Sequence, residues 1–168
     1  MKPDLHIVPE YYRGYINSTE DSSLIKQLDL TKNELIEILE MMTEDQAAYR
    51  YNLDKWSCRE VVLHIMDCER IFAYRALSFA RGEVQNLISF DQDKYVINSN
   101  AVNRTVPSLL KEYQRLREST IDLFENFSNE QLLMKGRVAE FEFSVNTLGY
   151  ILLGHQNHHV RIIKSKYL

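Results

Sequence analysis

Three of the five histidines of this 168-residue chain lie in one short segment, GHQNHHVRII, at positions 155, 158 and 159. His155 and His159 are four residues apart, which places their side chains one turn apart on the same face of a helix. Neutral imidazole is a common ligand of zinc, nickel and ferrous iron, so two rings at this spacing can bind one cation together. Whether they do so depends on where this face points.

Apolar residues mark the buried face of the helix expected around these histidines. At about 100° per residue, His155 and His159 fall in the middle of the apolar stripe and His158 falls at its edge. The stripe is formed by Val145, Leu148, Leu152, Ile162 and Ile163. His155 and His159 are therefore predicted to point into the core, whereas His158 is not.

A third histidine, His64, meets the same test on an earlier helix. Its face carries the apolar residues Val61, Cys68, Ile71, Phe72 and Phe79. A single inward histidine is more often hydrogen-bonded in a core than bound to a metal. Three histidines on two facing stripes favour a metal site, with His64, His155 and His159 as ligands and open positions for water or substrate.

Two known metal motifs do not fit these residues. The HQNHH segment has the spacing of the H-E-x-x-H zinc motif, but Gln156 stands where the general-base glutamate is needed, and an amide cannot accept that proton. Ferritin-like di-iron bundles need paired Glu-x-x-His motifs, whereas Glu60 precedes His64 by four residues and no second copy occurs. Both classes of metalloprotein are excluded.

Arg75 lies on the same predicted face as His64, three turns further along. A charge within an apolar stripe is unfavourable unless it is paired. We expect either a structural salt bridge, with Asp91, Asp93 or Glu112 as the partner, or an anionic group of a substrate or thiol cofactor.

Other polar residues of this helix are weaker candidates. Asp67 lies at the edge of the His64 face and is a candidate to orient a ligand histidine through a hydrogen bond. Otherwise Asp67 and Glu69 are expected on the helix surface. Cys68 is a candidate fourth ligand, with an ordinary buried cysteine as the alternative. Cys58 lies at a helix N-terminus, but no neighbouring base supports a reactive thiolate.

The elements that must position these residues are predicted to be long helices, because the chain has only five glycines and three prolines. We expect four helices, over 21–42, 57–81, 107–127 and 144–165, with capping boxes at Ser57 and Ser128. The segment 82–106 is long for a bundle connection and is a candidate for covering a site, and the segment 135–144 is a connector. The prediction is an all-α four-helix bundle formed by a single domain over residues 1–168.

Composition restricts the partners and the compartment. The net charge is −4 and the basic residues are dispersed, which argues against binding to nucleic acid or to an anionic membrane. Cys58 and Cys68 are ten residues apart on one helix, about 15 Å, too far for a disulfide. No apolar run approaches the ~18 residues needed to span a bilayer, and the first residues lack a signal-peptide core. We expect a cytoplasmic protein.

Taken together, the segments KWSCREVVLHIMDCERIFAYRALSFARGE, FDQDKY and LLGHQNHHVRIIKSKYL resemble the DinB superfamily, which includes the YfiT-like proteins and the bacillithiol and mycothiol transferases. The resemblance implies an up-down-down-up four-helix bundle, frequent homodimers and a divalent metal such as zinc or nickel. The family's metal triad falls on His64, His155 and His159. Many relatives carry glutamate where this chain has Gln156.

The resemblance leaves several functions open. Characterised relatives activate a low-molecular-weight thiol for transfer to an electrophile, and we expect a metal-dependent enzyme of this kind. A metal-dependent hydrolase that activates water at the same open position is the close alternative. A non-catalytic, stress-related metal-binding or interaction protein is a third possibility from a different class, because fold alone does not fix function.

Overall fold

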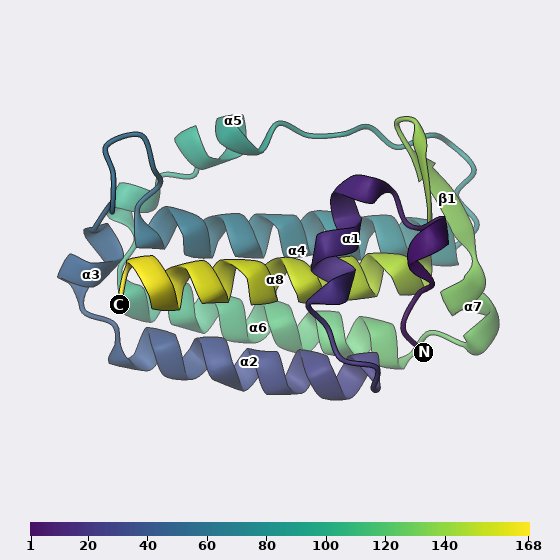
Figure 1. Cartoon of the computed structure of the whole chain (residues 1–168), viewed down its shortest axis with the longest axis horizontal. Coiled ribbons are helices and arrows are strands. Elements are labelled where there is room, and N and C mark those ends of the chain that lie inside the picture. Colours follow the sequence, from purple (N-terminus) through teal and green to yellow (C-terminus); the bar gives the residue numbers. More distant parts are fainter.

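The computed structural model describes residues 1–168 and is dominated by four long helices that lie side by side (Figure 1). They are α2 (Leu24–Met41), α4 (Cys58–Ala80), α6 (Val106–Glu125) and α8 (Val145–Lys166). All four predicted helices are confirmed, with ends that agree to within one turn. None of them is both long enough and apolar enough to cross a bilayer.

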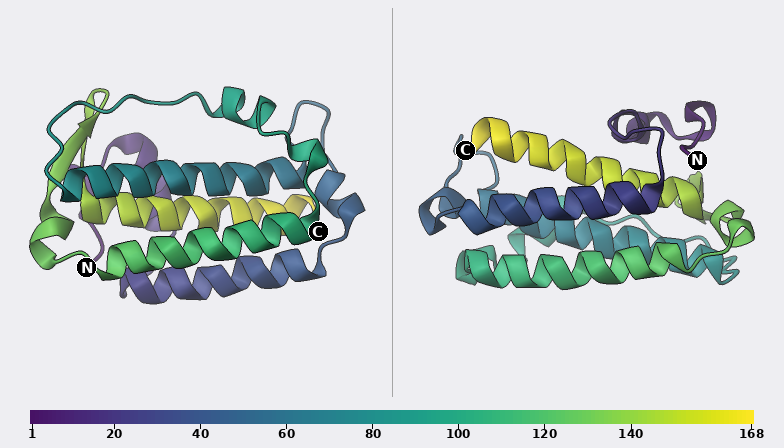
Figure 2. Two further views of the ribbon diagram at one scale, coloured as in Figure 1. Left: turned by 180° about the vertical axis from the view of Figure 1, so that it is seen from behind. Right: turned by 90° about the horizontal axis from the view of Figure 1, so that it is seen from below.

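The helices have the up-down-down-up order that the resemblance to the DinB superfamily implied. Helices α2 and α8 run in one direction and α4 and α6 run in the other, as the colours of Figures 1 and 2 show. Each helix packs against two others, in the pairs α4–α8, α2–α6, α4–α6 and α2–α8. Because the consecutive helices α4 and α6 are parallel, the segment 81–105 must return along the whole bundle. This crossover contains α5 (Gln92–Ile97) and η2 (Ala101–Asn103).

Side-chain caps explain where the long helices begin. The Ser57 hydroxyl accepts a hydrogen bond from the backbone N–H of Glu60, and the Glu60 carboxylate accepts one from the backbone N–H of Ser57 at 2.6 Å. This is the predicted capping box, which satisfies amides that the first helical turn leaves free. Thr105 and Ser144 cap α6 and α8 in the same way, through one hydrogen bond each.

Short elements close the two ends of the bundle and one side of it. They are η1 (Leu5–Ile7), α1 (Glu10–Asn17), α3 (Glu44–Ala48), α7 (Asn129–Leu133), β1 (Lys135–Val138) and β2 (Phe141–Ser144). The segment predicted as a plain connector therefore forms an antiparallel hairpin, in which Lys135 pairs with Ser144. Helix α1 lies across α8 so closely that a Cβ at Gly154 would be 2.1 Å from the Tyr15 carbonyl oxygen.

A polar layer divides the apolar core halfway along the bundle. One apolar cluster lies toward the hairpin and includes Leu28, Phe72 and Leu148, and the other lies toward the C-terminus and includes Leu35 and Val62. The polar layer between them is formed by Thr31, His64, Glu69, Tyr113, Arg117, His155, Gln156 and His159. All four long helices contribute to it.

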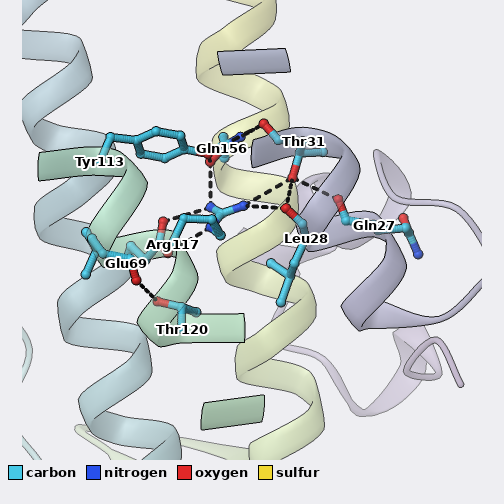
Figure 3. A network of polar contacts seen from close by, with 9 residues as sticks. Gln27, Leu28, Thr31, Glu69, Tyr113, Arg117, Thr120 and Gln156 are labelled. Carbon is cyan, nitrogen blue, oxygen red and sulfur yellow. Dashed lines mark hydrogen bonds and ion pairs between the residues drawn. The ribbon is translucent and has the colours of Figure 1, made fainter. Parts of the chain in front are cut away.

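Half of this layer is a network around Arg117, shown in Figure 3. Arg117 is fully buried, and its Nε and Nη2 donate to the two carboxylate oxygens of Glu69 at 2.8 and 2.7 Å. Its Nη2 also donates to Gln156 Oε1 at 2.5 Å. Nη1 donates to the Leu28 carbonyl and to the Thr31 hydroxyl. This bidentate, hydrogen-bonded geometry is what makes a buried ion pair tolerable.

The expectation that Glu69 lies on the helix surface was wrong. Glu69 is 2% exposed because α6 places Arg117 directly opposite it. The position of a residue on its own helix does not reveal the partner that a neighbouring helix supplies, so the pattern along α4 alone had no means of showing this pair.

Candidate metal centre

The structure brings the three predicted ligands together. His64 comes from α4, and His155 and His159 come from α8. The Nε2 atoms of His64 and His155 lie 3.0 Å apart, and each of the three rings offers a nitrogen within 4.8 Å of the others. The ring centroids are 4.5 to 4.9 Å apart. Three nitrogens at these distances can bind one cation after small rotations of the rings.

Burial keeps the three imidazoles neutral. It lowers the pKa of His64 to about 4 and that of His159 to about 3. Burial also lowers the pKa of His155, and the neighbouring His159 and His64 lower it further. No carboxylate forms an ion pair with any of the three rings. Each neutral ring has one nitrogen lone pair at neutral pH, and the neutral ring is the form that binds a metal.

One atom of the triad has no hydrogen-bond partner within the protein. His159 Nδ1 is buried and unpaired, although nearly all other buried side-chain nitrogens and oxygens have partners. An unpaired buried polar atom is unfavourable and calls for an explanation. Three neutral, converging donors with no competing charge fit a divalent cation of the zinc or nickel type.

Aromatic side chains fix the orientation of the rings. Trp56 packs on His64 with a centroid separation of 4.8 Å, and Tyr15 packs on His155 at 5.5 Å. His158 packs on Tyr15 at 5.6 Å and on His159 at 5.0 Å, and it is only partly buried. The predicted position of His158 at the edge of the stripe agrees with this placement.

The two cysteines are buried thiols. Cys68 Sγ lies 3.7 Å from both ring nitrogens of His64, so it borders the triad. Burial, with a smaller contribution from the nearby Asp67 carboxylate, raises the pKa of Cys68 to about 12. Cys58 contacts the sulfur of Met42 at 3.8 Å, and burial raises its pKa to about 12. Neither sulfur is a thiolate at neutral pH in the metal-free protein.

Asp67 lies next to a cation and not next to a histidine. Its carboxylate is 3.5 Å from Arg70, one turn along α4, and it accepts no hydrogen bond from His64, His155 or His159. The hydrogen bond by which Asp67 was expected to orient a ligand is absent. The angular position at the edge of the stripe turns Asp67 toward α6, on the side of Arg70 and Glu112.

Two cavities reach the triad. One, of about 180 Å³, contains His155 and Cys68 in a wall of aromatic residues, namely Tyr11, Tyr12, Tyr15, Phe72 and Phe90. The other, of about 230 Å³, contains His159 and Trp56 beside the polar residues Lys55 and Asp93. The crossover separates them, because Gln92 lines the first and Asp93 the second. The segment that was expected to cover the site does so.

Arg75 is buried without a carboxylate partner. It is 5% exposed, its Nη2 donates to the Ile88 carbonyl at 3.0 Å, and its guanidinium carbon lies 5.8 Å from the Phe72 centroid and 5.9 Å from that of Phe90. Burial lowers its pKa. The salt-bridge partners expected for Arg75 make no ion pair with it, and that expectation was wrong. Each is occupied or distant: Asp91 caps α5, Asp93 lines the His159 cavity, and Glu112 pairs with Arg70 and Arg104.

The sequence matches the family model of the DinB superfamily over residues 27–163, a range that contains all three histidines. The chain belongs to the DinB superfamily. Among solved structures it is similar to YfiT from Bacillus subtilis, described as a probable metal-dependent hydrolase with an unusual four-helix bundle topology. That likeness has a TM-score of 0.76 and 17% sequence identity, and covers 87% of this chain and 89% of YfiT. No curated protein matches the chain.

Proposed function

We propose that this DinB-superfamily protein is a metal-dependent enzyme that binds a divalent cation, zinc or nickel, through His64, His155 and His159. The observation that carries the proposal is the convergence of three neutral imidazoles, one with an unpaired buried nitrogen, between two cavities that contain His155 and His159. The description of YfiT as a probable metal-dependent hydrolase supports the same class of chemistry.

A divalent cation at such a site is a Lewis acid that makes a coordinated thiol or water more acidic near neutral pH. The protein's own contribution is to present neutral ligands, which leave the full charge of the cation available. Trp56 and Tyr15 hold the rings of His64 and His155 in place. The aromatic wall around His155 limits the access of water, which strengthens electrostatic interactions inside the cavity.

We propose transfer of a low-molecular-weight thiol to an electrophile as the reaction. The cavity at His155 is lined by aromatic residues and Cys68 and contains no carboxylate. A thiol that is already deprotonated needs no separate general base, whereas attack by water usually benefits from one. The two cavities offer room for two different reactants.

A metal-dependent hydrolase is the second candidate, and Asp93 is the observation that favours it. This residue lines the cavity that contains His159, where a carboxylate is the right group to accept a proton from water. The similarity to YfiT points in the same direction.

Metal content tests the site itself. Protein purified without an affinity tag should contain about one equivalent of zinc or nickel by inductively coupled plasma mass spectrometry, and His64→Ala should lose it. His158→Ala is the matched control, because His158 packs against Tyr15 and His159 but is not one of the three clustered histidines. Equal metal content in both variants would contradict the proposed ligand set.

Turnover separates the reactions. The metal-loaded protein is incubated with a panel of thiols and a bimane electrophile, and separately with ester and amide substrates. Thiol conjugation that disappears in His64→Ala supports the transferase, and thiol-independent hydrolysis lost in the same variant supports the hydrolase. Bound metal with no turnover of either kind favours the non-catalytic metal-binding protein.

A further inference from the structure

Arg75 is a buried cation without a carboxylate partner, and the ring of Phe72 lies between it and His155. Arg75 has five N–H donors, and its only hydrogen bond within the protein is the one to the Ile88 carbonyl. Every other buried arginine or carboxylate is paired: Arg117, which is completely buried, makes a bidentate salt bridge with Glu69. An isolated buried charge is strongly unfavourable. Arg75 forms no ion pair, and its guanidinium lines a cavity, so a ligand in that cavity can supply the negative charge.

The cavity next to Arg75 and the cavity at His155 share part of their wall. A cavity of about 190 Å³ contains Arg75, with Tyr12 and Phe90 in its wall. The same two side chains line the cavity that contains His155. Phe72 lies between the two polar groups, 5.8 Å from the Arg75 guanidinium and 6.2 Å from the His155 ring. Tyr12, Phe72 and Phe90 therefore lie between Arg75 and His155.

From this arrangement we propose that Arg75 binds the carboxylate of the substrate, and that the substrate is a small monocarboxylate with a flat apolar body. The body lies along Tyr12, Phe72 and Phe90, and the carboxylate forms a bidentate pair with the guanidinium. The opposite end of the molecule then reaches the triad. Only the part of the inference that concerns the reacting end of the substrate rests on the proposed function. Arg75 and its cavity exist independently of any metal.

The charge balance of the cavity favours a single negative charge. Arg75 is the only cationic residue in its lining, and the Glu140 carboxylate belongs to the same lining but is exposed to solvent and forms no ion pair with Arg75. A dianionic phosphate would bring two negative charges to one guanidinium beside this glutamate. A carboxylate brings one, which Arg75 neutralises.

The binding experiment uses 3-phenylpropionate, with 3-phenylpropionamide as the neutral analogue of the same shape, in isothermal titration calorimetry. Wild-type protein should bind the acid and not the amide. Arg75→Met keeps the apolar length of the side chain and should weaken binding of the acid by about tenfold or more. Arg81→Met is the matched control, because Arg81 lies exposed at the end of the same helix, and it should bind like the wild type.

Two further measurements separate this inference from the proposed metal chemistry. His64→Ala, which is designed to lose the metal, should still bind the acid. If a cation at the triad held the carboxylate in place of Arg75, this variant would not bind the acid. Arg75→Met should keep its metal and unfold at the same denaturant concentration as the wild type or a higher one, because an unpaired buried charge has been removed. Loss of stability would instead identify Arg75 as a structural residue.

The proposal is overturned if the acid and the amide bind equally, if Arg75→Met binds the acid like the wild type, or if inorganic phosphate binds more tightly than 3-phenylpropionate. Glu140→Gln provides a test in the opposite direction. Removing the second carboxylate from the cavity should tighten binding of the acid severalfold, and unchanged affinity would contradict the charge balance.

Discussion

Gln156 illustrates how one position can belong to the scaffold and not to the chemistry. It directly follows His155, one of the proposed ligands, yet its side chain belongs to the network around Arg117 (Figure 3). Its Oε1 accepts hydrogen bonds from the Tyr113 hydroxyl and from Arg117, and its Nε2 donates to the Thr31 carbonyl at 2.7 Å. The amide is needed because the position requires both a donor and an acceptor.

We therefore predict that Gln156→Glu lowers the free energy of unfolding by about 1 to 3 kcal/mol. The carboxylate loses the hydrogen bond to the Thr31 carbonyl and places a second buried negative charge beside Glu69. Urea denaturation measures the loss, with the exposed Gln85→Glu as the control for the added charge. A fully stable variant would show that the polar layer accommodates either residue.

The histidines make the stability of the metal-free protein depend on pH. In the folded state the pKa is about 4 for His64 and about 3 for His159, and His155 is also lowered, whereas in the unfolded chain each is near 6.5. Above pH 6.5 both states are neutral. As the pH falls from 6.5 toward 4, only the unfolded chain binds protons, so stability is lost.

The expected slope is about 1.4 kcal/mol per pH unit for each of these histidines. Denaturation of metal-free protein between pH 6.5 and 5 measures it, since most carboxylates remain ionised in that range. His159→Leu should have a shallower slope by about one histidine. A flat profile in the wild type would mean that the rings are charged in the folded state.

At the level of elements, the contact between α1 and α8 positions the aromatic wall of the His155 cavity. Gly154 allows this contact, because any Cβ there would meet the backbone of Tyr15. Tyr15 in turn packs on the His155 ring and lines the cavity. Gly154 on α8 therefore allows the close approach of α1, a helix that the sequence patterns did not predict.

Gly154→Ala should destabilise the protein by several kcal/mol or displace α1, because a rigid backbone segment and not a flexible side chain stands in the way. The matched control is Gly14→Ala in α1, where a Cβ meets no atom within 4 Å. That change should stabilise the protein by about 0.5 to 1 kcal/mol. Thermal unfolding of the two variants measures the contrast, and equal melting temperatures would contradict the close packing of α1 on α8.

The long helices were predictable because each repeats the same signals many times: apolar residues at helical spacing, and caps such as Ser57 with Glu60. The directions of His64, His155 and His159 followed from the same periodicity. Helix α1 and the hairpin at 135–144 were missed because eight-residue and four-residue elements offer little periodicity and depend on tertiary packing. The pairing of Glu69 with Arg117 was missed because it depends on how two helices are rotated against each other.

For the whole molecule, the polar layer is the feature that joins all four helices at one level. Breaking it from one side leaves a buried charge unpaired, so Arg117→Leu should cost about 3 to 5 kcal/mol of stability. The double variant Glu69→Leu with Arg117→Leu should recover much of that loss, because no charge then remains buried. Denaturation of both singles and the double gives the coupling energy, and additive losses would contradict a shared network.

The crossover between α4 and α6 is expected to tolerate sequence change more readily than the long helices do. The three histidines lie on long helices. The crossover, which contains Ile88, Phe90, Gln92 and Asp93, only has to connect the end of α4 to the start of α6. These four residues line or border the cavities around the triad and Arg75. Sequence changes within this crossover can alter which ligands fit the cavities while leaving the proposed metal centre intact. Among proteins with this topology, differences in ligand preference are therefore expected to arise mainly from sequence differences in the crossover.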